Sequence, residues 1–209
     1  MPPVHPGVGS AAPARAVATD LDPHDDLKQM ARPKRARARA ALVTHVRSGA
    51  VRAIAFSSDG ARLAVGGDDR TVALYDAAKG GGADPAEPPL LEFKRQSAVD
   101  SLAFSADGRL AIGGRDGTLS IENTKDGAEH AKYGDVARTG AISTLSFAPD
   151  GRLALGDGGG GVAVLEPTNG EVVLEIGRDG AVRAVSFSPD GARLAIGASA
   201  SLAILDLER

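Results

Sequence analysis

The chain has 209 residues, enough for one or two domains, and 43 % of them are hydrophobic. It contains no cysteine, which excludes a disulfide framework, a thiolate zinc site and a cysteine nucleophile. Residues 1–40 carry seven basic and four acidic side chains, net +3, whereas the remaining residues are net −6. An acidic body argues against nucleic-acid binding by the folded part, because phosphate contacts need clustered Lys and Arg. No apolar run approaches the length of a membrane span, so we expect no membrane partner and an intracellular protein, cytoplasmic or nuclear.

Residues 1–40 are predicted to form a disordered, basic N-terminal tail. Within it, Asp22 and Pro23 precede further acidic residues, a pattern that predicts a short helix near 22–31. Four basic side chains cluster at the end of the tail: Lys34, Arg35, Arg37 and Arg39. The cluster resembles a nuclear-import signal, and it also fits contact with nucleic acid or a solvated linker.

A repeated segment fills residues 41–209. Its copies begin near residues 47, 95, 138 and 178, so the spacings are 48, 43 and 40 residues. Each copy starts with Arg and ends in Asp-Gly, and a second apolar run follows. Four of the five phenylalanines occupy one repeat position: Phe56, Phe104, Phe147 and Phe187. The unit therefore contains at least two short strands joined by an Asp-Gly turn.

Further apolar runs complete the unit. Third strands are expected at 71–76, 118–122, 162–166 and 201–206, and fourth strands at 90–94, 130–133 and 171–176. Four strands in about 40 residues make one blade of a β-propeller. We therefore expect an all-β propeller domain over 41–209.

Two motifs connect these repeats to a known family. Phe187–Gly191 reads Phe-Ser-Pro-Asp-Gly, and Asp-x-Thr precedes the third strand of the first two repeats. These motifs resemble the WD-repeat (WD40) family, and the resemblance covers residues 41–209. It implies a propeller of four blades that acts as a non-catalytic protein–protein interaction scaffold.

The chain departs from the family pattern, since it has no tryptophan and lacks the Gly-His motif. Arginine stands where the family has histidine: Arg47, Arg95, Arg138 and Arg178. In the family this histidine bonds an aspartate in the turn between the second and third strands. The resemblance thus implies two structural pairs, which are Arg47–Asp69 and Arg95–Asp116. The third and fourth repeats lack this acid, with only Asp157 nearby in the third.

The order of strands raises the question of how the ring closes. Residues 41–46 form an orphan outer strand, and the last repeat stops after its third strand. If 41–46 pairs with 201–206, four blades close into a ring and hide the sheet edges. The alternatives are an incomplete ring that forms a homodimer, and a fragment of a longer propeller.

No catalytic, cofactor or metal site is predicted. The four histidines have no metal-ligand spacing. Residues 156–161 match Gly-x-Gly-x-x-Gly, but they link two expected strands and are interpreted as a turn. The sequence therefore favours a protein that binds partners over an enzyme.

One propeller face carries the candidate binding residues. In the family, the loops before the first strand and between the second and third strands share this face. The candidates for partner binding are Arg52, Asp100, Arg115, Arg138, Arg178 and Arg183. A mostly basic ring favours an acidic or phosphorylated peptide. The alternative function is a nuclear or nucleic-acid-associated factor that uses the basic residues of 32–39 while the propeller recruits partners.

Overall fold

The computed structural model describes residues 47–77, 88–133 and 140–207. These residues belong to a unit that spans Ala41–Arg209. The expected helix near 22–31, the basic cluster of the tail and the strand at 41–46 lie outside the described residues. The domain boundary proposed at residues 40 and 41 stays a prediction.

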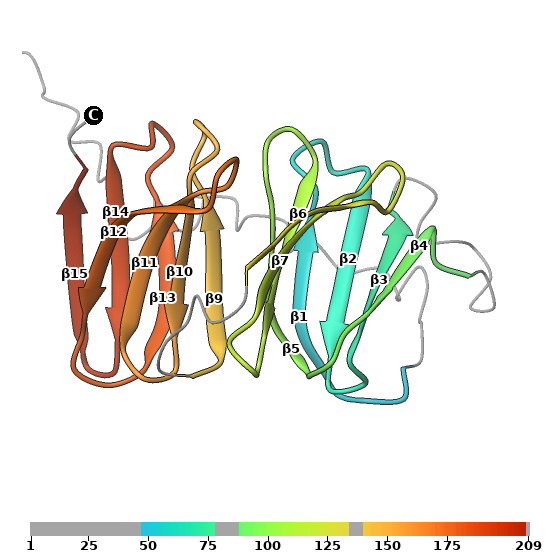
Figure 1. Ribbon diagram of the computed structural model, residues 1–209, viewed down its shortest axis with the longest axis horizontal. Coiled ribbons are helices and arrows are strands. Elements are labelled where there is room, and N and C mark those ends of the chain that lie inside the picture. The colour runs from blue at the N-terminus through green and yellow to red at the C-terminus, as the bar shows by residue number, and fades with distance from the viewer. Residues whose placement is uncertain (1–46, 78–87, 134–139, 208–209) are drawn as a thin grey trace, which may run out of the picture. The chain divides into compact units, whose positions relative to one another are not determined.

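The described residues form four antiparallel sheets in chain order (Figure 1). The first sheet contains β1 (Val51–Phe56), β2 (Arg62–Gly67), β3 (Thr71–Asp76) and β4 (Leu91–Lys94). The second contains β5 (Val99–Phe104), β6 (Arg109–Gly114), β7 (Leu119–Asn123) and β8 (Glu129–Tyr133). The third contains β9 (Ile142–Phe147), β10 (Leu153–Asp157), β11 (Gly161–Glu166) and β12 (Glu171–Gly177). The fourth contains β13 (Val182–Phe187), β14 (Arg193–Ala198) and β15 (Ser201–Asp206).

The Asp-Gly turns join the first and second strands of each sheet, as expected. In the first sheet, Ser57 Oγ donates to Asp59 Oδ1 at 2.5 Å, and this carboxylate oxygen also accepts from the Ala61 amide at 2.9 Å. Gly60 follows with φ of 69°, a left-handed conformation that glycine adopts without a steric penalty. The motif Ser-x-Asp-Gly thus encodes the turn. The hydrogen bond from Ser57 also holds the pKa of Asp59 below its ordinary value.

Neighbouring sheets stack through their first strands, which pack in the order β1, β5, β9 and β13. Each of the three described junctions contains its own apolar cluster. At the first junction, Val72 and Leu74 of the first sheet meet Val99 and Leu110 of the second, and all four are fully buried. The core is therefore a series of interfaces between consecutive sheets.

Small residues make this stacking close. A Cβ atom at Gly66 would lie 2.7 Å from Val99 Cγ1, and one at Gly156 would lie 2.4 Å from Val182 Cγ1. Gly113 stands in the same relation to Ile142, with a distance of 2.7 Å to Cγ2. Each of these glycines is therefore a socket that receives the first residue of the next sheet. Packing between sheets therefore accounts for some of the glycines in the chain, in addition to the glycines that composition alone would assign to turns.

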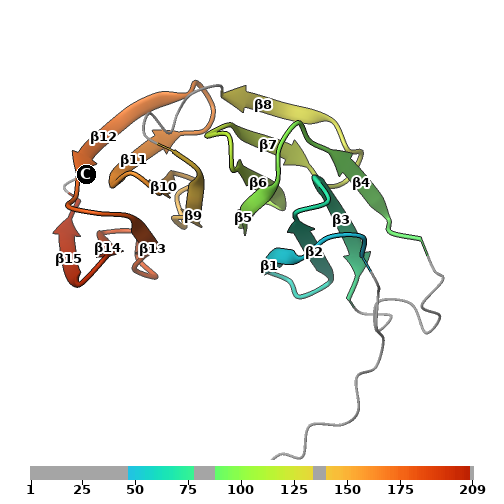
Figure 2. The same cartoon turned by 90° about the horizontal axis from the view of Figure 1, so that it is seen from below.

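The ends of the series are not joined by hydrogen bonds within the described residues. The fourth sheet has three strands, and β15 pairs with β14. Figure 2 shows the four sheets of this unit following one another along a curve, with β1 and β13 at its two ends. The arrangement agrees with a β-propeller, whereas closure through 41–46 stays a prediction.

Candidate protein-interaction face

One end of the stacked sheets carries most of the candidate residues. We call this end the rim, and define it by the starts of the first strands and the turns that follow the second strands. Strand register places both features together, because Val51 pairs with Gly67 and Val99 pairs with Gly114. The described candidates on the rim are Arg52, Asp100, Arg115, Arg178 and Arg183, and Asp68 lies among them.

On the first two sheets, the rim charges neutralise one another. Arg52 donates through Nε and Nη2 to both carboxylate oxygens of Asp68, at 3.0 and 2.8 Å. Arg115 bonds Asp100 at 2.7 Å and crosses between the sheets to Asp68 at 3.0 Å. The hydrogen bond from Arg52 holds the pKa of Asp68 below its ordinary value. These side chains therefore form an alternating chain of ion pairs and leave little net charge for a partner.

The repeat arginine of the first sheet is fully engaged. Arg47 Nε and Nη2 donate to Asp69 at 2.9 and 2.7 Å, and both side chains are about nine-tenths buried. Arg47 also donates to the carbonyl oxygens of Val65 and Thr71, at 2.8 and 2.9 Å. The guanidinium therefore ties β2 and β3 to the segment that precedes β1. This is the structural pair implied for the first repeat.

The implied pair of the second repeat is wrong. Arg95 Nη2 bonds Glu122 Oε1, and Asp116 instead accepts hydrogen bonds from Ser97 and Thr118. Glu122 lies in β7 and is 2 % exposed, so the buried carboxylate needs a cation more than the exposed turn carboxylate does. The sequence did not indicate Glu122 as a partner, although an acid at the end of an apolar third strand was the available signal.

The repeat arginine of the fourth sheet lacks such a partner. Arg178 Nη2 lies 3.5 Å from Ser201 Oγ, the limiting distance of a hydrogen bond. Its Nε atom is buried and has no hydrogen-bond partner within the described part of the chain. Arg183, at the start of β13, is exposed and makes no described ion pair or hydrogen bond. The fourth sheet therefore presents two cations that this part of the chain does not neutralise. Arg138 lies outside the described residues.

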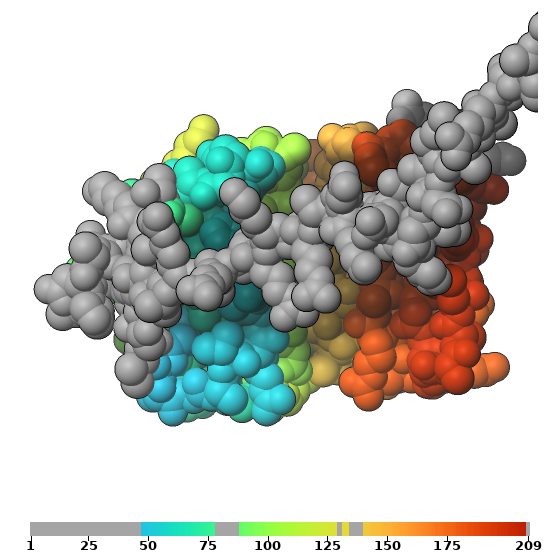
Figure 3. All heavy atoms as spheres, turned by 180° about the vertical axis from the view of Figure 1, so that it is seen from behind, coloured from blue at the N-terminus to red at the C-terminus, as the bar shows by residue number. Residues whose placement is uncertain are grey.

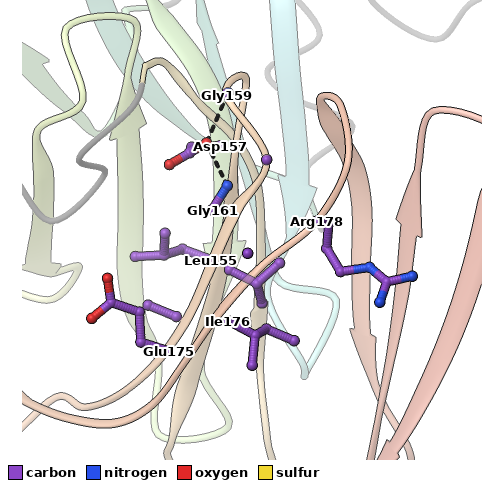
Figure 4. A pocket seen from close by; sticks show the side chains of 11 residues that line it. Leu155, Asp157, Gly159, Gly161, Glu175, Ile176 and Arg178 are labelled. Atoms are coloured by element: carbon purple, nitrogen blue, oxygen red, sulfur yellow. Dashed lines mark hydrogen bonds between the residues drawn. The ribbon is translucent and has the colours of Figure 1, made fainter.

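A pocket of about 480 Å³ adjoins Arg178, between the end of β12 and the turn from β14 to β15. Its lining includes Asp179, Ser199 and Ser201. A second pocket of about 280 Å³ lies on the third sheet and also reaches Arg178 (Figure 4). Figure 4 shows the guanidinium of Arg178 pointing away from Asp157. The pocket geometry thus leaves one side of Arg178 open to a ligand.

The glycine-rich segment 156–161 is a turn between β10 and β11, as the sequence predicts. Asp157 Oδ1 accepts from the amides of Gly159 and Gly161 at 2.8 and 2.9 Å (Figure 4). The segment is followed by a strand, so no helix N-terminus is available to cradle a phosphate. Asp157 thus stabilises its own turn.

Neither a metal centre nor a membrane-spanning helix is present in the described ranges. Within 47–77, 88–133 and 140–207, no group of three or more His, Asp or Glu side chains is arranged to hold a metal ion. The same residues contain no helix long and apolar enough to cross a membrane. The basic side chains Lys34, Arg35, Arg37 and Arg39 lie outside these ranges, so their role in import or nucleic-acid contact stays a prediction.

The stacked antiparallel sheets of three or four strands and the polar rim agree with a repeat protein of the β-propeller class. The sequence profile of the WD40 family, described as "WD domain, G-beta repeat", matches residues 38–76, 88–121 and 170–204. These segments cover more than half of the chain, and the protein belongs to the WD-repeat family. A search of curated proteins found no match.

The first three strands of the third sheet, β9 to β11, fall outside the three matched segments. They belong to the repeat in which glycines replace the turn acid and in which Ala148 stands where the other copies have serine. The structure nevertheless builds β9 to β12 as a complete sheet. The fold of this repeat is therefore maintained by its apolar pattern while its polar motif has diverged.

Proposed function

We propose that this protein is a non-catalytic scaffold that binds an acidic or phosphorylated protein segment at the rim of its fourth sheet. WD40 repeats generally mediate protein–protein interactions, and the family is typically non-catalytic. The observation that carries the finer proposal is that Arg178, next to the exposed Arg183, has no carboxylate partner among the described residues and that its buried Nε has no acceptor there. An anionic ligand supplies the acceptors that both guanidinium groups lack.

The contrast with the first two sheets supports this location. There Arg47, Arg52 and Arg115 each bond at least one carboxylate. On the fourth sheet, Arg178 and Arg183 are accompanied by Asp179, so these three side chains have a net charge of +1. Since charge-assisted hydrogen bonds are stronger than neutral ones, an anion gains most at the fourth sheet.

Binding of phosphoserine and glutamate-rich peptides to the full chain tests the proposal. The probe is a peptide array in which each anionic peptide has a neutral counterpart of the same length. Arg178→Gln combined with Arg183→Gln should weaken binding to anionic peptides by about 10-fold to 100-fold, because a hydrogen bond to a charged group contributes about 1.5–3 kcal/mol.

Arg193→Gln is the matched control. It removes one positive charge from the same sheet, but Arg193 pairs with Asp206 away from the rim. Equal binding by the double variant and the unmodified chain contradicts the proposal. Equal loss in the Arg193 control shows a general charge effect and contradicts the rim location.

A further inference from the structure

The first sheet carries an apolar face that meets no described neighbour. We call it the leading face and define it by Val51, Ile54 and Phe56 of β1. Val51 is 52 % exposed, although the residues at its repeat position, Val99 and Ile142, are 0 % exposed. β1 therefore has the same kind of first residue as β5 and β9, each of which packs against the sheet that precedes it.

The same comparison holds along the strand. Ile54 is 65 % exposed and Phe56 is 62 % exposed, whereas their counterparts in the fourth sheet, Val185 and Phe187, are buried. Cross-strand pairing places Val65 beside Ile54 and Leu63 beside Phe56, so the apolar surface continues onto β2. The leading face is thus a continuous patch that a neighbouring sheet covers elsewhere in the chain.

The fourth sheet carries the complementary face. We call it the trailing face and define it by Leu202 and Ile204 of β15 together with Gly197 of β14. Leu202 and Ile204 are 73 % and 64 % exposed. Their counterparts in the first three sheets are fully buried against the next sheet: Val72 and Leu74, Leu119 and Ile121, Val162 and Val164.

The two faces are complementary. The Val51 side chain on the leading face, which we call the knob, has no socket, and the Gly197 socket on the trailing face receives no side chain. In the three described junctions, Gly66, Gly113 and Gly156 receive the first residue of the next sheet. Gly197 occupies this position in the fourth sheet, but the nearest atom to a Cβ there would be Ala184 Cβ of its own sheet at 3.8 Å. Val51 is the corresponding first residue that has no socket.

The knob and socket of one chain do not meet in the structure. Val51 is half exposed, and the surroundings of Gly197 contain no atom of β1 within 4 Å. In Figure 3 the atoms of the first and fourth sheets lie at opposite ends of this unit, with those of the middle sheets between them. The described residues of one chain therefore do not supply the occupant of either end face.

We propose that two copies of this chain assemble head to tail, with Val51 of each copy seated in the Gly197 socket of the other. The leading face of one copy then packs on the trailing face of the second, by the same geometry as the three junctions inside each chain. Two such contacts close the pair and bury both end faces of both copies. The assembly contains eight sheets. It is independent of anion binding at the rim.

Cysteine crosslinking tests which atoms meet, because the chain contains no cysteine of its own. One full-length chain carries Val51→Cys and another carries Gly197→Cys. After mixing and mild oxidation by copper phenanthroline, we expect a disulfide-linked pair at twice the 21.1 kDa mass of one chain. The Gly66–Val99 Cβ distance in the first junction is 3.1 Å, which is shorter than the roughly 3.5–4.5 Å of a disulfide, so the two faces have to move apart by a few tenths of an ångström for the bond to close.

Other crosslinking results overturn the proposal. A pair that forms efficiently from the Val51→Cys chain alone shows that like faces meet. A third chain carries both Val51→Cys and Gly197→Cys. Absence of the mixed pair, together with an internal disulfide in this third chain, shows that one copy closes on itself. Absence of every disulfide shows that knob and socket do not meet at all.

Light scattering after size-exclusion chromatography gives a second test on the full chain. We expect the unmodified protein to have twice the mass of one chain, and Gly197→Val and Val51→Lys each to reduce it to one. Gly197→Val fills the socket without a close contact inside its own chain, so its melting temperature should stay near that of the monomeric Val51→Lys variant. Gly177→Ala is the control, because a Cβ at Gly177 meets no atom within 4 Å and lies outside the socket.

Mixing the two monomeric variants adds a decisive measurement. Each retains one intact face, so the head-to-tail arrangement predicts that a mixture recovers dimer through a single good contact. An unmodified chain that stays monomeric up to about 100 µM contradicts the proposal, since it implies a free energy of association weaker than about −5.5 kcal/mol. A mass that rises without limit with concentration contradicts the closed pair.

Discussion

The first and fourth sheets are built from the same repeat, yet they use its arginine differently. In the first sheet, Arg47 is buried and bonds Asp69, whereas Arg178 in the fourth reaches Ser201 at the limit of hydrogen-bond distance. The difference arises in the turn after the second strand, where the acid of the first repeat is replaced by Ser199 and Ala200. In these two sheets, the surroundings of the repeat arginine therefore depend on whether its own turn supplies an acid.

The largest predicted effect separates these two arginines. Arg47→Gln should lower the free energy of unfolding by about 3–5 kcal/mol, because it leaves the Asp69 carboxylate buried without its cation. Arg178→Gln should change it by less than about 0.5 kcal/mol, since Arg178 has no ion pair to lose within the described residues. Urea denaturation of both variants measures the difference, and equal losses would falsify the comparison.

A second prediction compares isoleucines at one repeat position. Ile121 is fully buried at the junction of the second and third sheets, and Ile204 is 64 % exposed on the trailing face. Ile121→Ala should cost about 2–5 kcal/mol, because it removes buried methyl groups and leaves a cavity. Ile204→Ala should cost less than about 0.5 kcal/mol in dilute solution, where association does not contribute.

The two isoleucine variants are compared by chemical denaturation at low micromolar concentration. A large loss in Ile204→Ala that persists on further dilution means that the trailing face is covered within one chain. That outcome would contradict the exposed end face.

The socket glycines give a third contrast of intermediate size. Gly156→Ala places a methyl group 2.4 Å from Val182 Cγ1 and 2.9 Å from Thr144 Cγ2, so the strands have to separate. We expect a loss of about 1–3 kcal/mol from this overpacking. Gly197→Ala should be neutral or slightly stabilising in dilute solution, where association does not contribute, because its Cβ makes an ordinary contact inside its own chain and alanine loses less entropy on folding. Thermal unfolding at matched concentrations checks the ranking, which a destabilised Gly197→Ala would reverse.

Most of the fold follows from the sequence because its signals are local and repeated. The Asp-Gly turns and the apolar runs on either side of them place the first two strands of every sheet. The ends of the third and fourth strands were less predictable: β7, a third strand, begins at Leu119 and ends at Asn123, one residue later than expected at each end. Strand ends depend on pairing with a neighbour, which periodicity does not contain.

The candidate site was predicted less well, because it depends on which side chains neutralise one another across strands. The sequence placed Arg52, Arg115 and Asp100 on one rim, but counting charges indicated a mostly basic ring. The structure shows that Asp68 bridges the arginines of two sheets. The pairing of Arg95 with Glu122 was missed for the same reason, since the family motif directs attention to the turn.

The smallest predicted effect concerns pH and returns to the first sheet. The Arg47 guanidinium holds the pKa of Asp69 below its ordinary value in the folded protein. The unfolded chain therefore takes up this proton at a higher pH than the folded chain does, and Asp69 stabilises the fold above the ordinary Asp pKa of about 4. This contribution is lost as the pH falls through the lower pKa of the folded protein.

Asp69→Asn should be less stable at pH 7 and should lose less stability between pH 5 and 3. Urea denaturation over this pH range tests the assignment, and an unchanged slope in Asp69→Asn would show that Arg47 stabilises the sheet through its backbone carbonyl contacts alone.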